Sequence, residues 1–456
     1  MSSTKSLQNG IDTLRATVIE GRTESVRHRQ NELHSMYSAL LENSNLIRDA
    51  ISKDSEVSAA EANREYLLAM DASVKIYETL DFDQSITNEY SIKECRDNQM
   101  RRIGAGIVLI RPTTHTRFYS LITPLVAAIA AGNCTLLEFE QPHSAVDNIL
   151  IDLLSSALDR GTFLFSKVRL EKCQLSQIDL FVDQTSTATT HASNELLSKS
   201  NARSLAVVDR TADIRHAANA IVRARLPPHN TSPYAPDLVI VNNFILQDFV
   251  KACFENAEGI TVSNSLEQNV SSDTKLKDLI RECENRGQLK VHRSNTSQLQ
   301  VVVVQDHSSQ LLNIKIGGPY IFVLLSTSTT DTITSQSSSP IFLATYNFAA
   351  PSLCKYLSQS LPSHTSFANH IPSSLLYGPA SPSPSTYPLA IHPRYTPEMF
   401  SVPRPEFFTQ VEFSTELKNL KPTGQKKGHA VGFFEQGIFI GLGLTGSVVL
   451  PLLGWG

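Results

Sequence analysis

The sequence predicts an α/β protein with a helical N-terminal segment. From Ile103 onward, strand-like and helix-like stretches alternate, which supports an α/β architecture. Residues 10–80 read as helical, and part of their apolar side chains recur at steps of three, four or seven, which places them on one face. Those side chains are Leu33, Met36, Leu40, Ile47 and Ile51. A chain of 456 residues can bury a large core and has room for two or three domains.

Composition excludes several functional classes. The formal net charge is -4 and no basic run exceeds a few residues, so the sequence does not predict nucleic-acid binding. The six cysteines contain no C-x-x-C pair, which argues against a disulfide framework or a zinc site and fits a reducing compartment. The 13 histidines include no H-E-x-x-H and no pair with metal spacing, so no metal site is expected. The Ser/Thr-rich tract at 325–339 is expected to be a surface loop.

Several separated segments carry a shared pattern. Residues 122–137 (ITPLVAAIAAGNCTLL) read as a proline-led helix followed by a strand, and a helix-like stretch from Ala220 leads into APD at 235–237. Further segments are 111–119, 207–214 (VVDRTADI), 315–319 (KIGGP) and 367–372 (FANHIP). Together they resemble the aldehyde dehydrogenase superfamily nearly end to end, and FANHIP resembles its class 3, or fatty aldehyde, branch.

The resemblance implies an aldehyde dehydrogenase-like fold with two principal domains. We expect a Rossmann-like, degenerate NAD-binding domain with a helical N-terminus over residues 1–204, and a catalytic-type α/β domain over 205–350. Residues 351–430 are expected to form a C-terminal return and oligomerisation region, followed by a hydrophobic tail at 437–456. A homodimer is expected from the resemblance alone.

The position of the family's catalytic cysteine is occupied by Pro233. The segment NTSPYAPD at 230–237 aligns without a gap to the family's G-Q-x-C-x-A-P-D, and only the APD remains. Proline has no thiol and no backbone N–H, so it can neither attack a carbonyl nor donate to the resulting oxyanion. The family's oxyanion-donor asparagine corresponds to Thr114, with one residue of alignment slack. The glutamate that serves as base has no recognisable equivalent, and Glu195 is the nearest carboxylate in sequence. No catalytic residues are therefore expected.

The positions that hold the nicotinamide dinucleotide in the family have also changed. Glu138 replaces a lysine that contacts the adenosine ribose, and Asp183 and Gln184 replace the glycine and serine of the pyrophosphate turn. Lys315 and Gly317 replace the glutamate and phenylalanine of E-I-F-G-P. A carboxylate at a helix start that would bind phosphate should repel it, so Asp183 is expected to oppose the cofactor. We expect no cofactor, and NAD(P) is suggested by the resemblance alone.

The last 20 residues contain no charge. A helix over residues 437–456 would reach roughly 30 Å, enough to cross a bilayer core. Lys421, Lys426 and Lys427 precede it, which by the positive-inside tendency puts the body on the cytosolic face of an intracellular membrane. The alternative is a hairpin or buried terminal segment, which the internal glycines and Pro451 favour.

Two functions from different classes follow. The leading hypothesis is a pseudoenzyme that lacks NAD-dependent aldehyde oxidation and acts by binding or scaffolding at a membrane. The alternative is a repurposed or still active enzyme for an aldehyde or lipid-like metabolite, with His115, Thr114 and His229 as first candidates. Ordinary aldehyde dehydrogenase activity would require the alignment above to be wrong. The small aldehyde or lipid-like ligand is not identified by the sequence.

Overall fold

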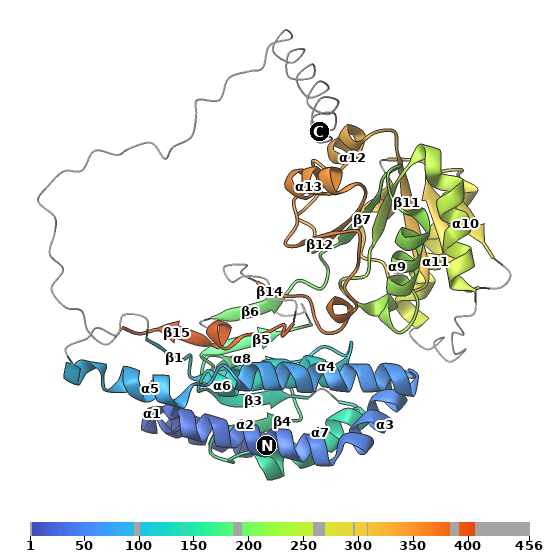
Figure 1. Cartoon of the computed structure of the whole chain (residues 1–456). Coiled ribbons are helices and arrows are strands. Elements are labelled where there is room, and N and C mark those ends of the chain that lie inside the picture. Colours follow the sequence, from blue (N-terminus) through green and yellow to red (C-terminus); the bar gives the residue numbers. More distant parts are fainter. Residues whose placement is uncertain are drawn as a thin grey trace, which may run out of the picture. The chain divides into compact units, whose positions relative to one another are not determined.

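The computed structural model describes residues 2–94, 101–139, 141–185, 194–258, 270–294, 297–307, 309–383 and 392–405. All of these residues lie within one compact unit, residues 1–408 (Figure 1). The predicted tail at 437–456 lies outside the described residues. In the described part of the chain, none of the helices has both the length and the apolar character needed to cross a bilayer.

The N-terminal segment is helical, as predicted. It forms α1 (Ser2–Glu20), α2 (Val26–Glu42), α3 (Ser44–Ser55), α4 (Ala59–Tyr77) and α5 (Phe82–Glu89). The predicted apolar face is buried as expected. Two helices share it, because the helical segment is interrupted at Asn43, between α2 and α3. Its side chains enter the core cluster that covers one face of the first sheet.

The first sheet has six strands in the order β14-β6-β5-β2-β3-β4. Its central strands β2 (Ile107–Arg111), β3 (Cys134–Glu138) and β5 (Leu180–Asp183) are parallel, as are β4 (Phe163–Ser166) and β6 (Glu195–Ser198). Strand β14 (Pro382–Ser383) joins the edge antiparallel to β6. From β2 the chain builds outward through β3 and β4 on one side and through β5 and β6 on the other. The order therefore reverses between β2 and β5.

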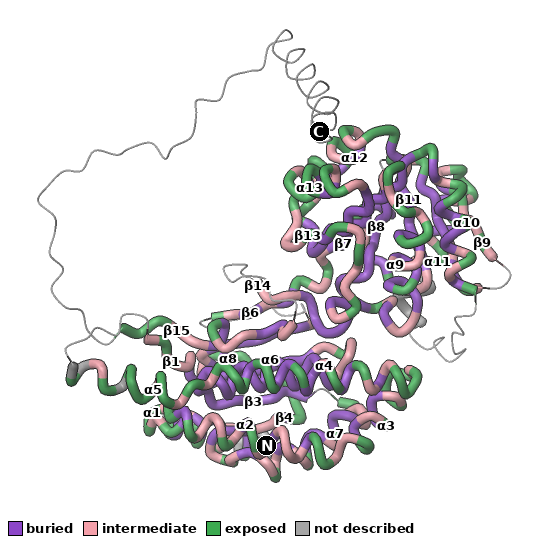
Figure 2. The backbone as a smooth tube through the Cα atoms, in the orientation of Figure 1, coloured by how far each residue is buried: buried purple, intermediate pink, exposed green. Residues whose placement is uncertain are grey.

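Both faces of this sheet are buried, which explains the continuous apolar runs of its strands. Along β2, Val108 and Ile110 pack on the cluster formed with α2, α3, α4, α6 (Arg117–Ala130) and α7 (Ala145–Ala157). Ile107 and Leu109 face the opposite cluster, made with α1 and α8 (Lys172–Leu175). Figure 2 shows the buried strands between helices whose outer surfaces are exposed.

The second sheet has seven strands in the order β13-β12-β7-β8-β11-β10-β9. They are β7 (Ser204–Val208), β8 (Leu238–Asn242), β9 (Leu289–Arg293), β10 (Gln300–Val304), β11 (Tyr320–Ser326), β12 (Ala344–Phe348) and β13 (Ser366–Ala368). All pairings are parallel except that of β9 with β10. Helices α9 (Ile214–Arg225) and α10 (Leu246–Ala257) bury one face. Helices α11 (Val270–Asn285) and α13 (Pro351–Ser360) contribute to the core on the other.

The segment after β12 returns to both sheets. Strand β13 extends the second sheet beyond residue 350, β14 pairs with the first sheet, and β15 (Ser401–Pro403) pairs with β1 (Arg102–Gly104). The Ser/Thr-rich tract at 325–339 was expected to be a loop, and this prediction is wrong. It contains the end of β11 and helix α12 (Thr329–Ser335), which begins because the Ser328 side chain accepts a hydrogen bond from the Asp331 backbone N–H.

Candidate functional site

Three charged side chains meet at the carboxyl edge of the first sheet. Arg111, Glu138 and Asp183 are the last residues of β2, β3 and β5, which are neighbours in the sheet. Arg111 and Asp183 lie in register on either side of the point where the strand order reverses. In open α/β sheets this carboxyl-edge reversal is where ligands bind. The three side chains therefore stand where the fold would place a dinucleotide.

These side chains bind one another. Arg111 Nε lies 2.5 Å from Glu138 Oε1, and Arg111 Nη1 lies 3.8 Å from Asp183 Oδ2. Glu138 also accepts the backbone N–H of Leu170 at 3.1 Å, and Asp183 accepts that of Thr185 at 2.8 Å. All three are buried. Asp183, which is expected to oppose the cofactor, and Glu138 are thus buried beside the guanidinium of Arg111.

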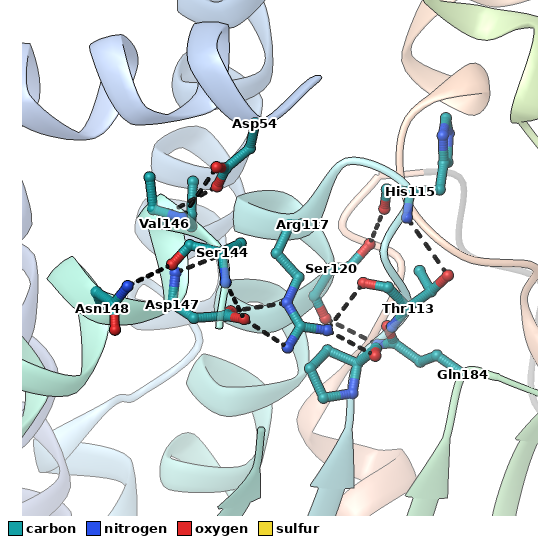
Figure 3. Close-up of polar contacts among 12 residues, drawn as sticks. Asp54, Thr113, His115, Arg117, Ser120, Ser144, Val146, Asp147, Asn148 and Gln184 are labelled. Carbon is teal, nitrogen blue, oxygen red and sulfur yellow. Dashed lines mark hydrogen bonds and ion pairs between the residues drawn. The ribbon is translucent and has the colours of Figure 1, made fainter. Parts of the chain in front are cut away.

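Gln184 joins this edge to the loop at 112–116. Its side chain accepts the Thr113 N–H at 3.0 Å and donates to the Ser120 carbonyl at 2.8 Å and to Tyr395 Oη at 3.1 Å. Figure 3 shows Arg117 holding the same loop from the side of α7. Arg117 donates to the Pro112 carbonyl at 2.8 Å and pairs with Asp147 at 2.8 Å. The loop at 112–116 is thus fixed by the protein's own hydrogen bonds.

Pro233 lies in the loop between α9 and β8, where the resemblance places the family nucleophile. It is buried, and its carbonyl accepts hydrogen bonds from Ser204 Oγ at 3.2 Å and from Lys315 Nζ. Lys315 Nζ also lies 2.8 Å from Asp237 Oδ2 and donates to the Ala202 carbonyl at 3.1 Å. Lys315 therefore links this loop to Ala202 and Asp237. Burial lowers the pKa of Lys315, and the nearby Asp237 carboxylate raises it.

Asp237 binds three groups in this region, one of which is the Lys315 ammonium. Its carboxylate is buried and also accepts the backbone N–H groups of Ser204 at 2.7 Å and Ile316 at 3.0 Å. It thereby fastens the start of β7 to the segment before β11. Gly317, two residues from Lys315, is exposed, and a Cβ built on it would meet no atom within 4 Å. Nothing in its surroundings requires a glycine.

The three candidates for a repurposed site differ in their surroundings. Thr114 is exposed. His115 is half-buried and engages both ring nitrogens, Nδ1 with Thr231 Oγ1 at 3.0 Å and Nε2 with the Leu376 carbonyl at 2.9 Å. His229 is buried, packs edge-on to Tyr377 and lies 3.9 Å from Glu61. Burial lowers the pKa of His229. The structure thus brings His115 to the loop that carries His229.

Several residues at these sites were missed by sequence reasoning. Arg111 enters the sequence analysis only as the first residue of a motif. Charged residues that end three buried strands are a sequence pattern that could have indicated the ion pairs. No local sequence pattern identifies Thr231 and Leu376 as partners of His115, because they lie 116 and 261 residues from it along the chain. Among the residues that the structure describes, no group of three or more His, Cys, Asp or Glu side chains could hold a metal ion.

Comparison with known proteins agrees with this architecture. No family model matches the chain. Mouse aldehyde dehydrogenase family 3 member B2 is 29% identical over 157 residues, which are 34% of this chain and 33% of that protein. The sequence match therefore spans about a third of the relative's length.

Solved structures cover much more of the chain. Staphylococcus aureus AldH, in a substrate-bound state, superposes with a TM-score of 0.69 at 16% identity, covering 96% of this chain and 99% of that one. Glyceraldehyde-3-phosphate dehydrogenase GapN from Methanocaldococcus jannaschii, complexed with NADP, gives a TM-score of 0.68 at 14% identity, covering 88% and 94%. The sequence match to family 3 members and the shared α/β fold support a class 3-like assignment within the aldehyde dehydrogenase superfamily.

Proposed function

We propose that this protein does not oxidise aldehydes with NAD or NADP and acts by binding or scaffolding. The observation that carries the proposal is the buried Arg111, Glu138 and Asp183 group at the strand-order reversal. A dinucleotide entering there would have to displace a buried ion pair, and separating such a pair costs about 3–5 kcal/mol. Pro233 supports the proposal independently, because its loop offers no thiol to form a covalent adduct with an aldehyde.

Thermal unfolding in the presence of NAD and NADP tests whether the protein binds either cofactor. A ligand present at 100 times its Kd stabilises the native state by about 2.7 kcal/mol, which would raise the melting temperature measurably. We expect no rise with millimolar NAD or NADP. A catalytically active family 3 aldehyde dehydrogenase serves as the positive control. A clear dose-dependent rise for this protein would refute the proposed exclusion of the cofactor.

The chemistry is tested separately with medium- and long-chain aldehydes. We expect no NAD(P)H formation above the rate without protein. Turnover that disappears when a single cysteine is replaced would show that a nucleophile exists elsewhere and that the alignment at Pro233 is wrong. Turnover without such a cysteine would favour the alternative of a repurposed enzyme for an aldehyde or lipid-like metabolite.

A membrane attachment through residues 437–456 is part of this proposal. Its support is the uncharged sequence of that segment with the preceding Lys421, Lys426 and Lys427. The expected location is the cytosolic face of an intracellular membrane. Fractionation of an N-terminally tagged protein with and without residues 437–456 tests it. The full chain should sediment with membranes and the truncated chain should not, and a soluble full chain would refute the anchor.

A further inference from the structure

A cavity of about 280 Å³ lies between α11 and the starts of β10 and β11 in the second sheet. Gln300 of β10 pairs in register with Arg293 of β9 and with Tyr320 of β11, so the three side chains stand in one row. The row faces α11, because Val302, two residues after Gln300, packs in the core cluster that contains Ile280 of that helix. These three side chains therefore form the wall of the cavity on the side of the sheet.

Helix α11 provides the opposite wall. Lys277 and Arg281 line the cavity and are four residues apart, so they are neighbours on one side of the helix. Ile280 is buried in the core and also lines the cavity, which fixes the orientation of the helix beside it. Lys277 and Arg281 are both exposed, so a small molecule can reach the cavity from solvent.

The side chains around the cavity carry positive charge. Lys277, Arg281 and Arg293 are cations, and none of the other residues that line it in the described part of the chain is acidic. Glu284, which does not line the cavity, binds Arg293, whose Nη1 and Nη2 donate to its carboxylate at 3.1 and 2.8 Å. The Arg281 guanidinium makes no ion pair or hydrogen bond with another residue that the structure describes. An anion in the cavity would provide its partner.

The chemistry of the lining favours a phosphate over a carboxylate. A guanidinium binds phosphate oxygens through parallel N–H donors, and a lysine ammonium adds a compact point charge. A phosphate monoester carries about −1.5 to −2 charges at pH 7 and three strong acceptor oxygens, whereas a carboxylate carries one charge. Gln300 adds a side-chain amide, and the buried Tyr320 adds a ring on which an organic group can pack. The volume of about 280 Å³ is just under the roughly 300 Å³ at which ligand pockets usually begin, which suits a small ester.

We propose that this cavity binds small phosphate monoesters, with Lys277 and Arg281 holding the phosphate and Tyr320 contacting the organic group. The site goes beyond the proposed function, because it belongs to the second sheet and the excluded cofactor concerns the first. NAD also contains phosphates, and Arg281→Gln separates the two sites. A rise in melting temperature with NAD that persists in Arg281→Gln arises from the first sheet and leaves the phosphate cavity untouched.

Isothermal titration calorimetry of the full chain with phenyl phosphate, at constant ionic strength, tests the proposal. We expect the parent protein to bind one equivalent. Arg281→Gln should weaken binding about 10-fold to 100-fold, the usual effect of losing a hydrogen bond to a charged group. Inorganic phosphate, which has no organic group to pack on Tyr320, should bind more weakly than phenyl phosphate.

Arg286→Gln is the matched control. It removes the same charge from an exposed arginine that follows α11 and pairs with Glu282, outside the cavity. It should bind phenyl phosphate like the parent. Because Arg281 and Arg286 are both exposed, each variant should also melt like the parent, so that a change in affinity reports on the cavity and not on folding.

The natural phosphate could belong to a soluble ester or to a lipid headgroup, and vesicles distinguish the two. Phosphatidylcholine vesicles with and without phosphatidic acid, which ends in a phosphate monoester, are compared for the full chain and for Arg281→Gln. Extra binding to phosphatidic acid that Arg281→Gln removes would identify a lipid source, and equal binding to both kinds of vesicle would identify a soluble ester. An affinity for phenyl phosphate that Arg281→Gln leaves unchanged, an equal loss in Arg286→Gln, or no binding to either phenyl phosphate or phosphatidic acid would each overturn the proposal.

Discussion

Replacing Arg111 by methionine tests whether the three buried charges at the carboxyl edge form one unit. The change removes the cation that lies 2.5 Å from Glu138 and 3.8 Å from Asp183 and leaves both carboxylates in place. The Glu138 and Asp183 side chains have no exposed surface, so water cannot replace the guanidinium without opening the fold. Methionine is unbranched and fills much of the space of the arginine stem.

Removing one partner of a buried ion pair costs about 3–5 kcal/mol, because a buried charge is left uncompensated. We expect a loss of this size in the free energy of unfolding of Arg111→Met. Replacing the charged groups together costs much less, since no uncompensated charge remains. A protein with Arg111→Met, Glu138→Met and Asp183→Asn should therefore recover most of the stability that Arg111→Met loses.

Urea unfolding of the parent, the single variant and the triple variant measures both effects. Arg286→Met, which removes an exposed pair with Glu282, is the control and should leave the unfolding midpoint nearly unchanged. A loss below about 1 kcal/mol for Arg111→Met, the size typical of a surface pair, would refute the argument, as would a triple variant no more stable than the single one.

Three other substitutions have defined outcomes. Burial raises the pKa of Glu65 to about 7, so the stability that its protonated form contributes is fully present below about pH 4.5 and is lost as the pH rises through 7. Glutamine cannot ionise, so Glu65→Gln should not show this loss. In urea unfolding, the free energy of unfolding of Glu65→Gln relative to that of the parent should rise by about 3 kcal/mol between pH 5 and pH 9. Lys315→Met should lower the free energy of unfolding by about 3 kcal/mol in urea, because buried Asp237 loses its cation, and an unchanged midpoint would contradict that role. Gly378 has φ +81° and a Cβ there would lie 2.5 Å from the Tyr119 ring, so calorimetry should find Gly378→Ala destabilised by about 1–3 kcal/mol.

The α/β fold could be predicted because the local patterns agree with the tertiary structure. Strands such as β2 and β5 are buried on both faces, so apart from their last residue they appear in the sequence as apolar runs. The division of the N-terminal apolar face between α2 and α3 could not be predicted, since no glycine or proline marks the break at Asn43. Helix α12 was missed because serine and threonine suit both loops and helix N-caps.

The contacts of the candidate site could not be predicted from the sequence. The resemblance predicts that Glu138, Asp183 and Lys315 stand at cofactor positions, with their charges facing the cofactor. The structure gives each of them a protein partner: Arg111 for the two acids and Asp237 for the lysine. Such pairs depend on the order of the strands in the sheet and on which distant segments meet in the fold. A single sequence shows neither.

The carboxylate of Asp237 also has a consequence for the rate at which the protein unfolds. It bonds Ser204, 33 residues earlier, and Ile316, 79 residues later, so its contacts require two long loops to be closed. Contacts of this kind are expected to form late in folding, and losing a late contact accelerates unfolding while leaving the folding rate nearly unchanged. The aspartate of the Ala-Pro-Asp segment would then govern the lifetime of the native state, even though the loop beside it has no thiol.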